Sequence, residues 1–399
     1  EAEGFYRIAA TQLDEHIGPS LANATRDERS QLAYILERLG ECTRIQGNYD
    51  EARHLYERVL EVRSHQRTFV SQEEHQYEAQ IDALLWLEVA LTWYDVGDGV
   101  QAQKCCERGE QVLSEAGVVG GAAWAILRFQ EGYNSWHEGN YHVAWSKAQD
   151  ALKLFEEALK QQHPSPINVI HQTGTKRTLA GDPVNLGRIQ TLIGAIANLV
   201  GEHTEALNYL KSALNVFEQY NCKREIANVC CNLGDVYLRK AEHEQARAAF
   251  SRSNYLAEMI GDVPLMSAVF GNLGVLAARS GNLSEAEEWF KRGIKLAEWI
   301  KDQTYICVLH IYLAIVLQDQ RKRSQSIKSI LYALSISRST KNTPYVGFAL
   351  VVIGNIDSKQ AMALIDSKEN VNQENKKYKI REKDQDLNAV SYTHLRAHE

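Results

Sequence analysis

Residues 232–250 read NLGDVYLRKAEHEQARAAF, and this stretch decides the fold. Gly234 and Ala246 stand twelve residues apart, and Leu233, Tyr237 and Phe250 surround them at helical spacing. Two small residues at this offset suit the point where two antiparallel helices cross, because a larger side chain there would push the backbones apart. The stretch therefore predicts a helical hairpin in which the apolar side chains fill the space around a close crossing.

The same hairpin pattern recurs along the chain. Small residues repeat every 40 positions at Gly194, Gly234, Gly274, Ala314 and Gly354, and the first four are followed twelve residues later by Ala206, Ala246, Ala286 and Ser326. The offset occurs three more times upstream, as Gly40 with Ala52, Ala90 with Ala102, and Gly132 with Ala144. Seven occurrences predict an array of about seven and a half stacked hairpins.

The predicted turns agree with this array. Gly47, Gly139, Gly201 and Gly281 fall where the first helix of a hairpin should end, and glycine readily adopts the left-handed conformation of a helix end. Between hairpins, Asn221, Gly261, Lys301 and Lys341 share one phase of the repeat. Ser284 with Glu287 predicts a capping box at the start of a second helix.

These residues resemble the tetratricopeptide signature Leu-Gly-x2-Tyr…Ala-x3-Phe, which residues 233–250 match in full. The resemblance covers about Gln31 to Ile356 and implies an all-α fold, a right-handed α-solenoid of antiparallel helix hairpins. The usual unit has about 34 residues, so the 40-residue period is a long variant. That variant is similar to the sensor regions of bacterial signal-transduction ATPases and of maltose-activator-like regulators.

The pattern divides the chain into segments. We expect a helical segment of an incomplete preceding repeat at 1–30, repeats one to three at 31–160, and repeats four to seven plus the first helix of an eighth at 186–356. Between them lies a proline-containing inserted loop at 161–185, which is either a tolerated surface insertion or a contact loop. A polar segment predicted to be disordered follows at 357–389. Residues 390–399 read VSYTHLRAHE, which resembles a translated sequencing adapter. Because the chain begins at Glu1 rather than methionine, we expect the array to be part of a longer protein.

Composition excludes several function classes. The net charge is −7, so the basic stripe needed for binding a phosphate backbone is missing and we expect no nucleic-acid binding. The longest apolar runs are much shorter than the roughly 20 residues of a membrane-spanning helix. Seven scattered cysteines without a Cys-x-x-Cys pair favour a reducing compartment, so we expect a cytoplasmic protein.

No catalytic motif is present in the sequence, and we expect neither enzymatic activity nor a cofactor nor a metal site. The candidate binding residues lie on first helices, which in this family face the concave groove. Asn232 and Asn272 occupy equivalent positions there and could bond an extended peptide backbone, or else neighbouring helices or water. Tyr94, Phe129, Tyr133 and Trp136 could anchor a partner on the same inner face, although aromatic residues at helical spacing are more often core.

Three functions fit these observations. The leading hypothesis is a protein-interaction and sensor region of a larger cytoplasmic bacterial regulator that binds a peptide or partner in its groove. The second is a stand-alone scaffold for complex assembly. The third is an accessory repeat region of an enzyme whose catalytic domain lies elsewhere.

Overall fold

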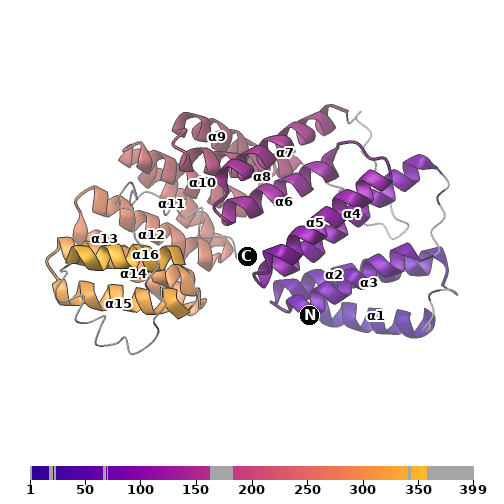
Figure 1. Ribbon diagram of the computed structural model, residues 1–399, viewed down its shortest axis with the longest axis horizontal. Coiled ribbons are helices and arrows are strands. Elements are labelled where there is room, and N and C mark those ends of the chain that lie inside the picture. The colour runs from indigo at the N-terminus through magenta and orange to yellow at the C-terminus, as the bar shows by residue number, and fades with distance from the viewer. Residues whose placement is uncertain are drawn as a thin grey trace, which may run out of the picture. The chain divides into compact units, whose positions relative to one another are not determined.

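The computed structural model describes residues 2–17, 21, 24–65, 69, 71–161, 183–339 and 343–356. These residues form sixteen α-helices and no strands, which confirms the predicted all-α class (Figure 1). Most of the predicted insert, the polar segment 357–389 and the adapter-like residues 390–399 lie outside the described residues. The chain divides after Ile196 into two compact units.

Unit 1 is a succession of antiparallel helical hairpins. The pairs α2 with α3, α4 with α5, and α6 with α7 make the most extensive contacts, and α1 packs on α2. The helices of unit 1 are α1 (Ala2–Ile17), α2 (Arg26–Ile45), α3 (Tyr49–Ser64), α4 (Gln72–Asp95), α5 (Gly99–Glu115), α6 (Ala122–His137) and α7 (Tyr141–Gln161). Helix α8 (Pro183–Leu199) carries the boundary between the units.

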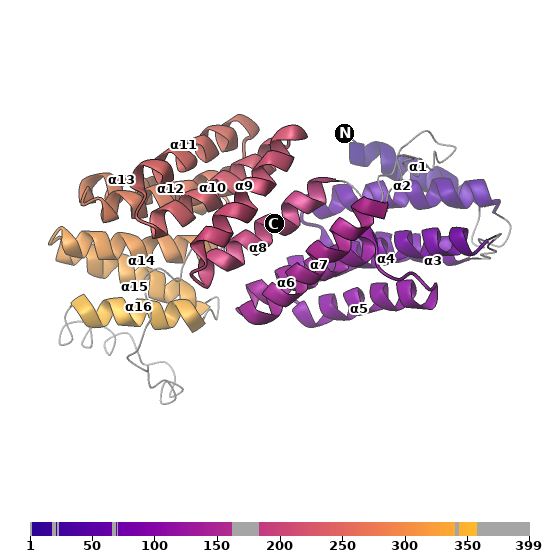
Figure 2. The same ribbon diagram turned by 90° about the horizontal axis from the view of Figure 1, so that it is seen from above.

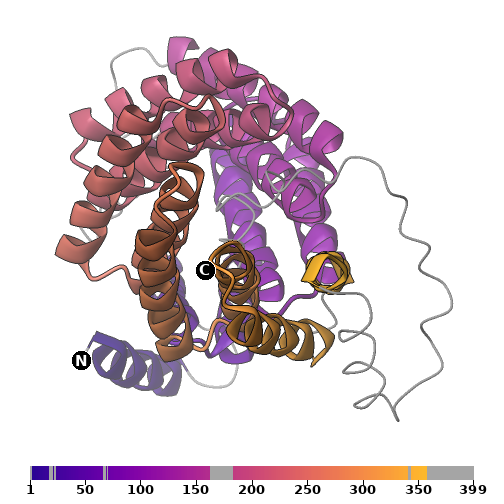
Figure 3. The same cartoon turned by 90° about the vertical axis from the view of Figure 1, so that its left-hand side faces the viewer.

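Unit 2 repeats the same arrangement. The hairpins pair α10 with α11, α12 with α13, and α14 with α15, while α10, α12 and α14 also contact one another in succession (Figure 2). The helices are α9 (His203–Gln219), α10 (Lys223–Arg239), α11 (His243–Ile260), α12 (Val263–Arg279), α13 (Leu283–Trp299), α14 (Gln303–Asp319), α15 (Arg323–Ser339) and α16 (Thr343–Ile356). The last helix, drawn in yellow, packs on α14 and α15 (Figure 3). We call α10, α12 and α14 the inner helices of unit 2, and α2, α4 and α6 those of unit 1.

Small residues lie where the two helices of a hairpin cross. A Cβ atom added to Gly234 would lie 2.4 Å from the ring of Phe250, and one added to Gly274 would lie 2.6 Å from the ring of Phe290. At Gly132 the nearest atoms are backbone atoms of α7, at 3.2 Å. A Cβ at Gly354 would meet no atom within 4 Å. The alanines twelve residues further on are fully buried: Ala52, Ala144, Ala206, Ala246 and Ala286.

The turns also follow the 40-residue period. Left-handed backbone occurs at Gly201, Ala241, Gly281 and Arg321 inside hairpins, and at Asn221, Gly261 and Lys301 between them. The capping box predicted at Ser284 is wrong, because α13 begins two residues earlier than predicted, at Leu283, after the N-cap residue Asn282. Glu287 instead binds two lysines. A capping box does form at Thr25 with Glu28, at the start of α2.

Candidate functional site

The two candidate asparagines lie on neighbouring inner helices of unit 2 but differ in their bonding. Asn272 of α12 donates a hydrogen bond from Nδ2 to the Sγ atom of Cys231 on α10, at 3.3 Å. Asn232 of α10 is 8% exposed, and its Oδ1 atom has no hydrogen-bond partner within the described part of the chain. An unsatisfied buried acceptor costs about 1–3 kcal/mol. Of the two asparagines, Asn232 is therefore the one whose side-chain oxygen has no hydrogen bond within the described part of the chain.

A charged network continues the inner face of unit 2 beyond these asparagines. Asp235 accepts hydrogen bonds from Nδ2 of Asn198, at 2.6 Å, and from Nε of Arg239, at 3.2 Å. In the next repeat, Arg279 of α12 donates a hydrogen bond from Nη1 to the backbone carbonyl oxygen of Leu238 on α10, at 3.2 Å. Burial, followed by the charge of Asp235, raises the pKa of Tyr312 on α14.

Asp235, Arg239, Arg279 and Tyr312 are not among the candidate residues that the sequence indicates. The 40-residue spacing of the two arginines was a usable signal, since both stand five residues after the small residue of their first helix. The network places polar and cationic groups along α10 and α12. Such groups can bond the backbone or the acidic side chains of an extended segment.

The four candidate aromatic residues of unit 1 do not form a single exposed surface. Phe129 and Tyr133 have ring centroids 6.2 Å apart, and Tyr133 lies 5.7 Å from Trp136. Trp136 is 5% exposed and therefore belongs to the core, whereas Phe129 and Tyr133 are half-buried. Tyr94 packs against the core between α4, α5 and α6, and burial raises the pKa of its hydroxyl.

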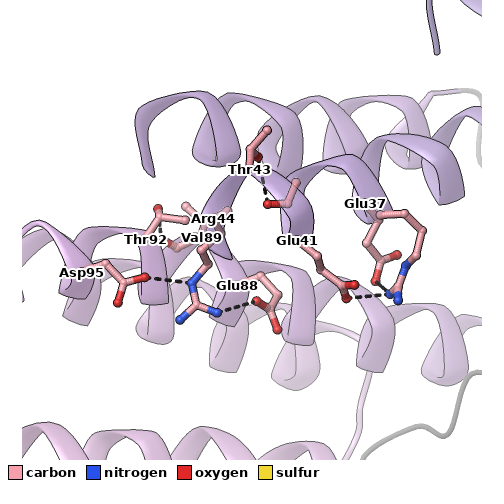
Figure 4. Close-up of polar contacts among 10 residues, drawn as sticks. Glu37, Glu41, Thr43, Arg44, Glu88, Val89, Thr92 and Asp95 are labelled. Atoms are coloured by element: carbon pink, nitrogen blue, oxygen red, sulfur yellow. Dashed lines mark hydrogen bonds and ion pairs between the residues drawn. The ribbon is translucent and has the colours of Figure 1, made fainter. Parts of the chain in front are cut away.

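Charged residues connect α2 with α4 on the inner side of unit 1 (Figure 4). Arg44 of α2 binds Asp95 of α4 through Nε at 2.8 Å, and its Nη1 lies 3.7 Å from Glu88. Arg38 binds Glu41 at 2.7 Å and lies 3.3 Å from Glu37. Glu37 and Asp95 are largely buried, whereas the side chains of Glu41 and Glu88 are 41% and 35% exposed. Each of these four carboxylates therefore has an arginine of α2 as a partner.

Parts of this hairpin array match models of a known repeat family. Models described as "Tetratricopeptide repeat" match residues 31–68 in unit 1, and residues 185–253 and 224–298 from α8 to α13. The chain contains tetratricopeptide repeats. Each matched region contains the small-residue crossing described above.

Solved structures share the repeat fold at low sequence identity. The chain is similar to a Rap protein complexed with competence and sporulation factor, with a TM-score of 0.61 and 14% identity over 85% of this chain and 87% of that one. The apo form of RapI gives a TM-score of 0.56 at 14% identity, covering 84% and 85%.

A signal-transduction ATPase with a tetratricopeptide repeat sensor from Pyrococcus horikoshii gives a TM-score of 0.52 at 14% identity. The similarity covers 87% of this chain and half of that protein. No curated protein matches the chain in sequence. At this identity, the similarities establish the fold of the repeats.

The third repeat departs from the tetratricopeptide pattern by burying a charge. Glu131 stands where the other repeats have leucine, isoleucine or valine before the small residue, and it is 5% exposed. Its Oε2 atom binds Arg128 at 2.6 Å and Lys147 at 2.7 Å, and Arg128 also binds Glu110 at 2.8 Å. Burial alone would raise the pKa of Glu131, but the hydrogen bonds from Lys147 and Arg128 lower it.

A second carboxylate with two cationic partners connects two repeats of unit 2. Glu287 of α13 accepts hydrogen bonds from Lys291, at 2.5 Å, and from Lys322 in the turn between α14 and α15 of the next hairpin, at 2.7 Å. Burial would raise the pKa of this carboxyl, but the two lysines bring it down to about 2. The ion pairs therefore connect one repeat to the next at neutral pH.

Two further features of the described residues concern metal ligands and the protonation of the thiols. Within them, no group of three histidine, cysteine or acidic side chains is arranged to hold a metal ion. Burial raises the pKa of the thiol of Cys106 to about 12 and those of Cys230 and Cys307 to about 11, so these thiols are protonated at neutral pH. None of the described helices is long and apolar enough to cross a lipid bilayer.

Proposed function

We propose that the chain is a protein-interaction region whose inner helices bind an extended segment of a partner protein. The observation that carries the proposal is the buried Oδ1 atom of Asn232, which has no partner within the described residues. A backbone N–H group of a bound segment would satisfy it, and the neighbouring Arg239 and Arg279 would bond carbonyl or carboxylate oxygens of the same segment.

The finer proposal is a sensor role in a cytoplasmic bacterial regulator. Two of the similar structures support it: one is a Rap protein complexed with competence and sporulation factor, and another carries a tetratricopeptide repeat sensor. A bound segment would bias the stacking of successive inner helices, because it contacts several of them at once.

The proposal is tested by selecting peptides from a random-peptide phage library on the full chain. A recovered peptide is then titrated, with fluorescence anisotropy as the readout, against wild type and the double variant Asn232→Ala, Asn272→Ala. Asn215→Ala is the matched control, because Asn215 is an exposed asparagine on the outer helix α9.

We expect peptides whose affinity falls about tenfold or more in the double variant, which corresponds to about 1.4 kcal/mol, and stays unchanged in the control. If no recovered peptide distinguishes the double variant from wild type, these inner-face asparagines are structural and the proposed function is wrong.

A further inference from the structure

Asp235 is a largely buried carboxylate on the inner helix α10, and both of its donors bind the same oxygen. Nδ2 of Asn198 and Nε of Arg239 donate to Oδ2, at 2.6 Å and 3.2 Å. Within the described part of the chain, Oδ1 accepts no hydrogen bond and keeps contact with solvent. One oxygen therefore fixes the carboxylate, and the other is open to a ligand.

The donors of Asp235 lie on two helices, so they hold its carboxylate in one orientation. Asn198 belongs to α8, and Arg239 lies one turn further along α10. Asn198 and Asp235 are 2% and 6% exposed, so neither side chain can rotate into water. A carboxylate held in this way needs no rearrangement before it accepts a hydrogen bond from a ligand.

The amide of Asn198 has a defined orientation. A carboxylate only accepts hydrogen bonds, so the group of Asn198 that faces Asp235 is its NH2 group. The Oδ1 atom of Asn198 then faces Nδ1 of His203 at 3.1 Å, which requires a proton on Nδ1. Burial lowers the pKa of His203, so its ring is neutral at neutral pH and donates from this nitrogen. Asn198 is therefore a positioning residue that connects the start of α9 with Asp235.

The charges around Asp235 favour a neutral donor over a cation. Arg239 pairs with the carboxylate, and Arg279 of α12 reaches the same part of α10, where its Nη1 binds the carbonyl oxygen of Leu238. One carboxylate (−1) beside two guanidinium groups (+2) gives a local net charge of +1, which repels lysine and arginine side chains. A backbone N–H group carries no net charge, and its hydrogen bond to a carboxylate is charge-assisted.

We propose that Asp235 determines the specificity of the inner face of unit 2 by accepting, on Oδ1, a hydrogen bond from one backbone N–H group of the bound segment. Asn198 and Arg239 hold Oδ2, so the acceptor keeps a fixed place one turn after Asn232 on α10. This inference rests on the proposed function, because it concerns the same bound segment. It adds that the segment meets Asp235 with a backbone N–H group rather than with a basic side chain.

Asp235→Asn tests the proposal because it reverses the polarity of the open atom. Asn198 and Arg239 both need an acceptor, so the carboxamide oxygen takes the place of Oδ2 and the NH2 group takes the place of Oδ1. A donor then faces the N–H group of the bound segment. The matched control is Asp150→Asn, which makes the same exchange at an exposed position of the outer helix α7. The urea midpoint of each variant is compared with that of wild type.

The probe is a peptide recovered by phage selection on the full chain whose binding depends on Asn232 and Asn272. Esters of this peptide, each with one backbone N–H group replaced by oxygen, are titrated by fluorescence anisotropy. We expect Asp235→Asn to weaken the parent peptide about tenfold or more, as for loss of a charge-assisted hydrogen bond, and the control to leave it unchanged. One ester should bind wild type about tenfold more weakly than the parent peptide, but bind Asp235→Asn as well as the parent does.

A second variant, Asn198→Ala, tests the positioning role and replaces Asp235→Asn if that variant does not fold. It removes one donor from Oδ2 and should weaken the parent peptide about threefold. The same ester should then weaken binding less than it does in wild type. Replacing a basic residue of the peptide by glutamine should leave the effect of Asp235→Asn unchanged.

Three results would overturn this inference alone. They are equal affinity of the parent peptide for wild type and Asp235→Asn, an ester effect of equal size in wild type and both variants, and an effect of Asp235→Asn that disappears with the basic residue of the peptide. The proposed function would stand in each case, because the peptide still depends on Asn232 and Asn272. If no recovered peptide depends on those asparagines, the proposed function fails and this inference fails with it.

Discussion

Gly234→Ala tests whether the small residues set the distance between the helices of a hairpin. A Cβ at this position would lie 2.4 Å from Cε1 and 2.5 Å from Cδ1 of Phe250. Carbon atoms in contact are normally about 3.5–4.0 Å apart, so the overlap exceeds about 1 Å. Phe250 is fully buried and cannot swing into solvent.

Overpacking of this kind costs about 1–3 kcal/mol, and the better helix propensity of alanine returns up to about 1 kcal/mol. We expect Gly234→Ala to lower the free energy of unfolding by about 1–2 kcal/mol. The matched control is Gly347→Ala in α16, where an added Cβ meets no atom within 4 Å, and we expect it to stabilise its helix by up to about 1 kcal/mol.

The assay is urea-induced unfolding followed by circular dichroism, with native-state hydrogen exchange to localise the change to α10 and α11. The double variant Gly234→Ala, Phe250→Leu removes the clashing ring. It should be at least about 1 kcal/mol more stable than the sum of the single effects implies. If Gly234→Ala stabilises the protein as Gly347→Ala does, the crossing is not limited by this glycine and the reasoning fails.

Three further predictions concern the turns and the buried ions. Ala241→Gly relieves a left-handed backbone conformation at φ 59° and should raise the free energy of unfolding by about 0.5–1 kcal/mol in urea titrations; a loss would contradict it. The pKa of the Glu287 carboxyl is lowered in the folded state, so the ionised carboxylate stabilises the folded protein relative to Glu287→Gln. This difference in the free energy of unfolding should be full above about pH 4.5 and vanish as the pH falls to about 2. A difference between the two proteins that does not change over this range in pH-dependent urea titrations would refute that assignment. Lys147→Met leaves Glu131 buried with one ion-pair partner fewer and should lower the free energy of unfolding by about 2 kcal/mol in urea or thermal unfolding. Adding Glu131→Leu should restore most of this loss. An equal loss in the single and double variants would show that Lys147 does not act through Glu131.

The sequence predicted the repeat architecture because the fold depends on local contacts of fixed spacing. The pairing of Gly234 with Phe250 and the left-handed positions at 221 and 261 can be read from residue type and period alone. The predicted start of α13 was misplaced by two residues, because Asn282 and Ser284 both suit an N-cap and only the backbone path distinguishes them.

The candidate site was less predictable because it depends on contacts between repeats. Asn232 and Asn272 look equivalent in the sequence, yet only Asn272 finds the Cys231 thiol of the neighbouring helix. The buried charge at Glu131 also depends on Lys147 of the next helix, which no local pattern reveals. Spacing identifies which residues share a face, but the bonds between faces follow from the packed structure.

The central claim is that partner segments bind the inner helices. It is tested most directly by hydrogen–deuterium exchange of the full chain with and without a recovered peptide that depends on Asn232. The account predicts added protection in α10 and α12, with the outer helices α11 and α13 unchanged. Protection confined to α11 and α13 would contradict it.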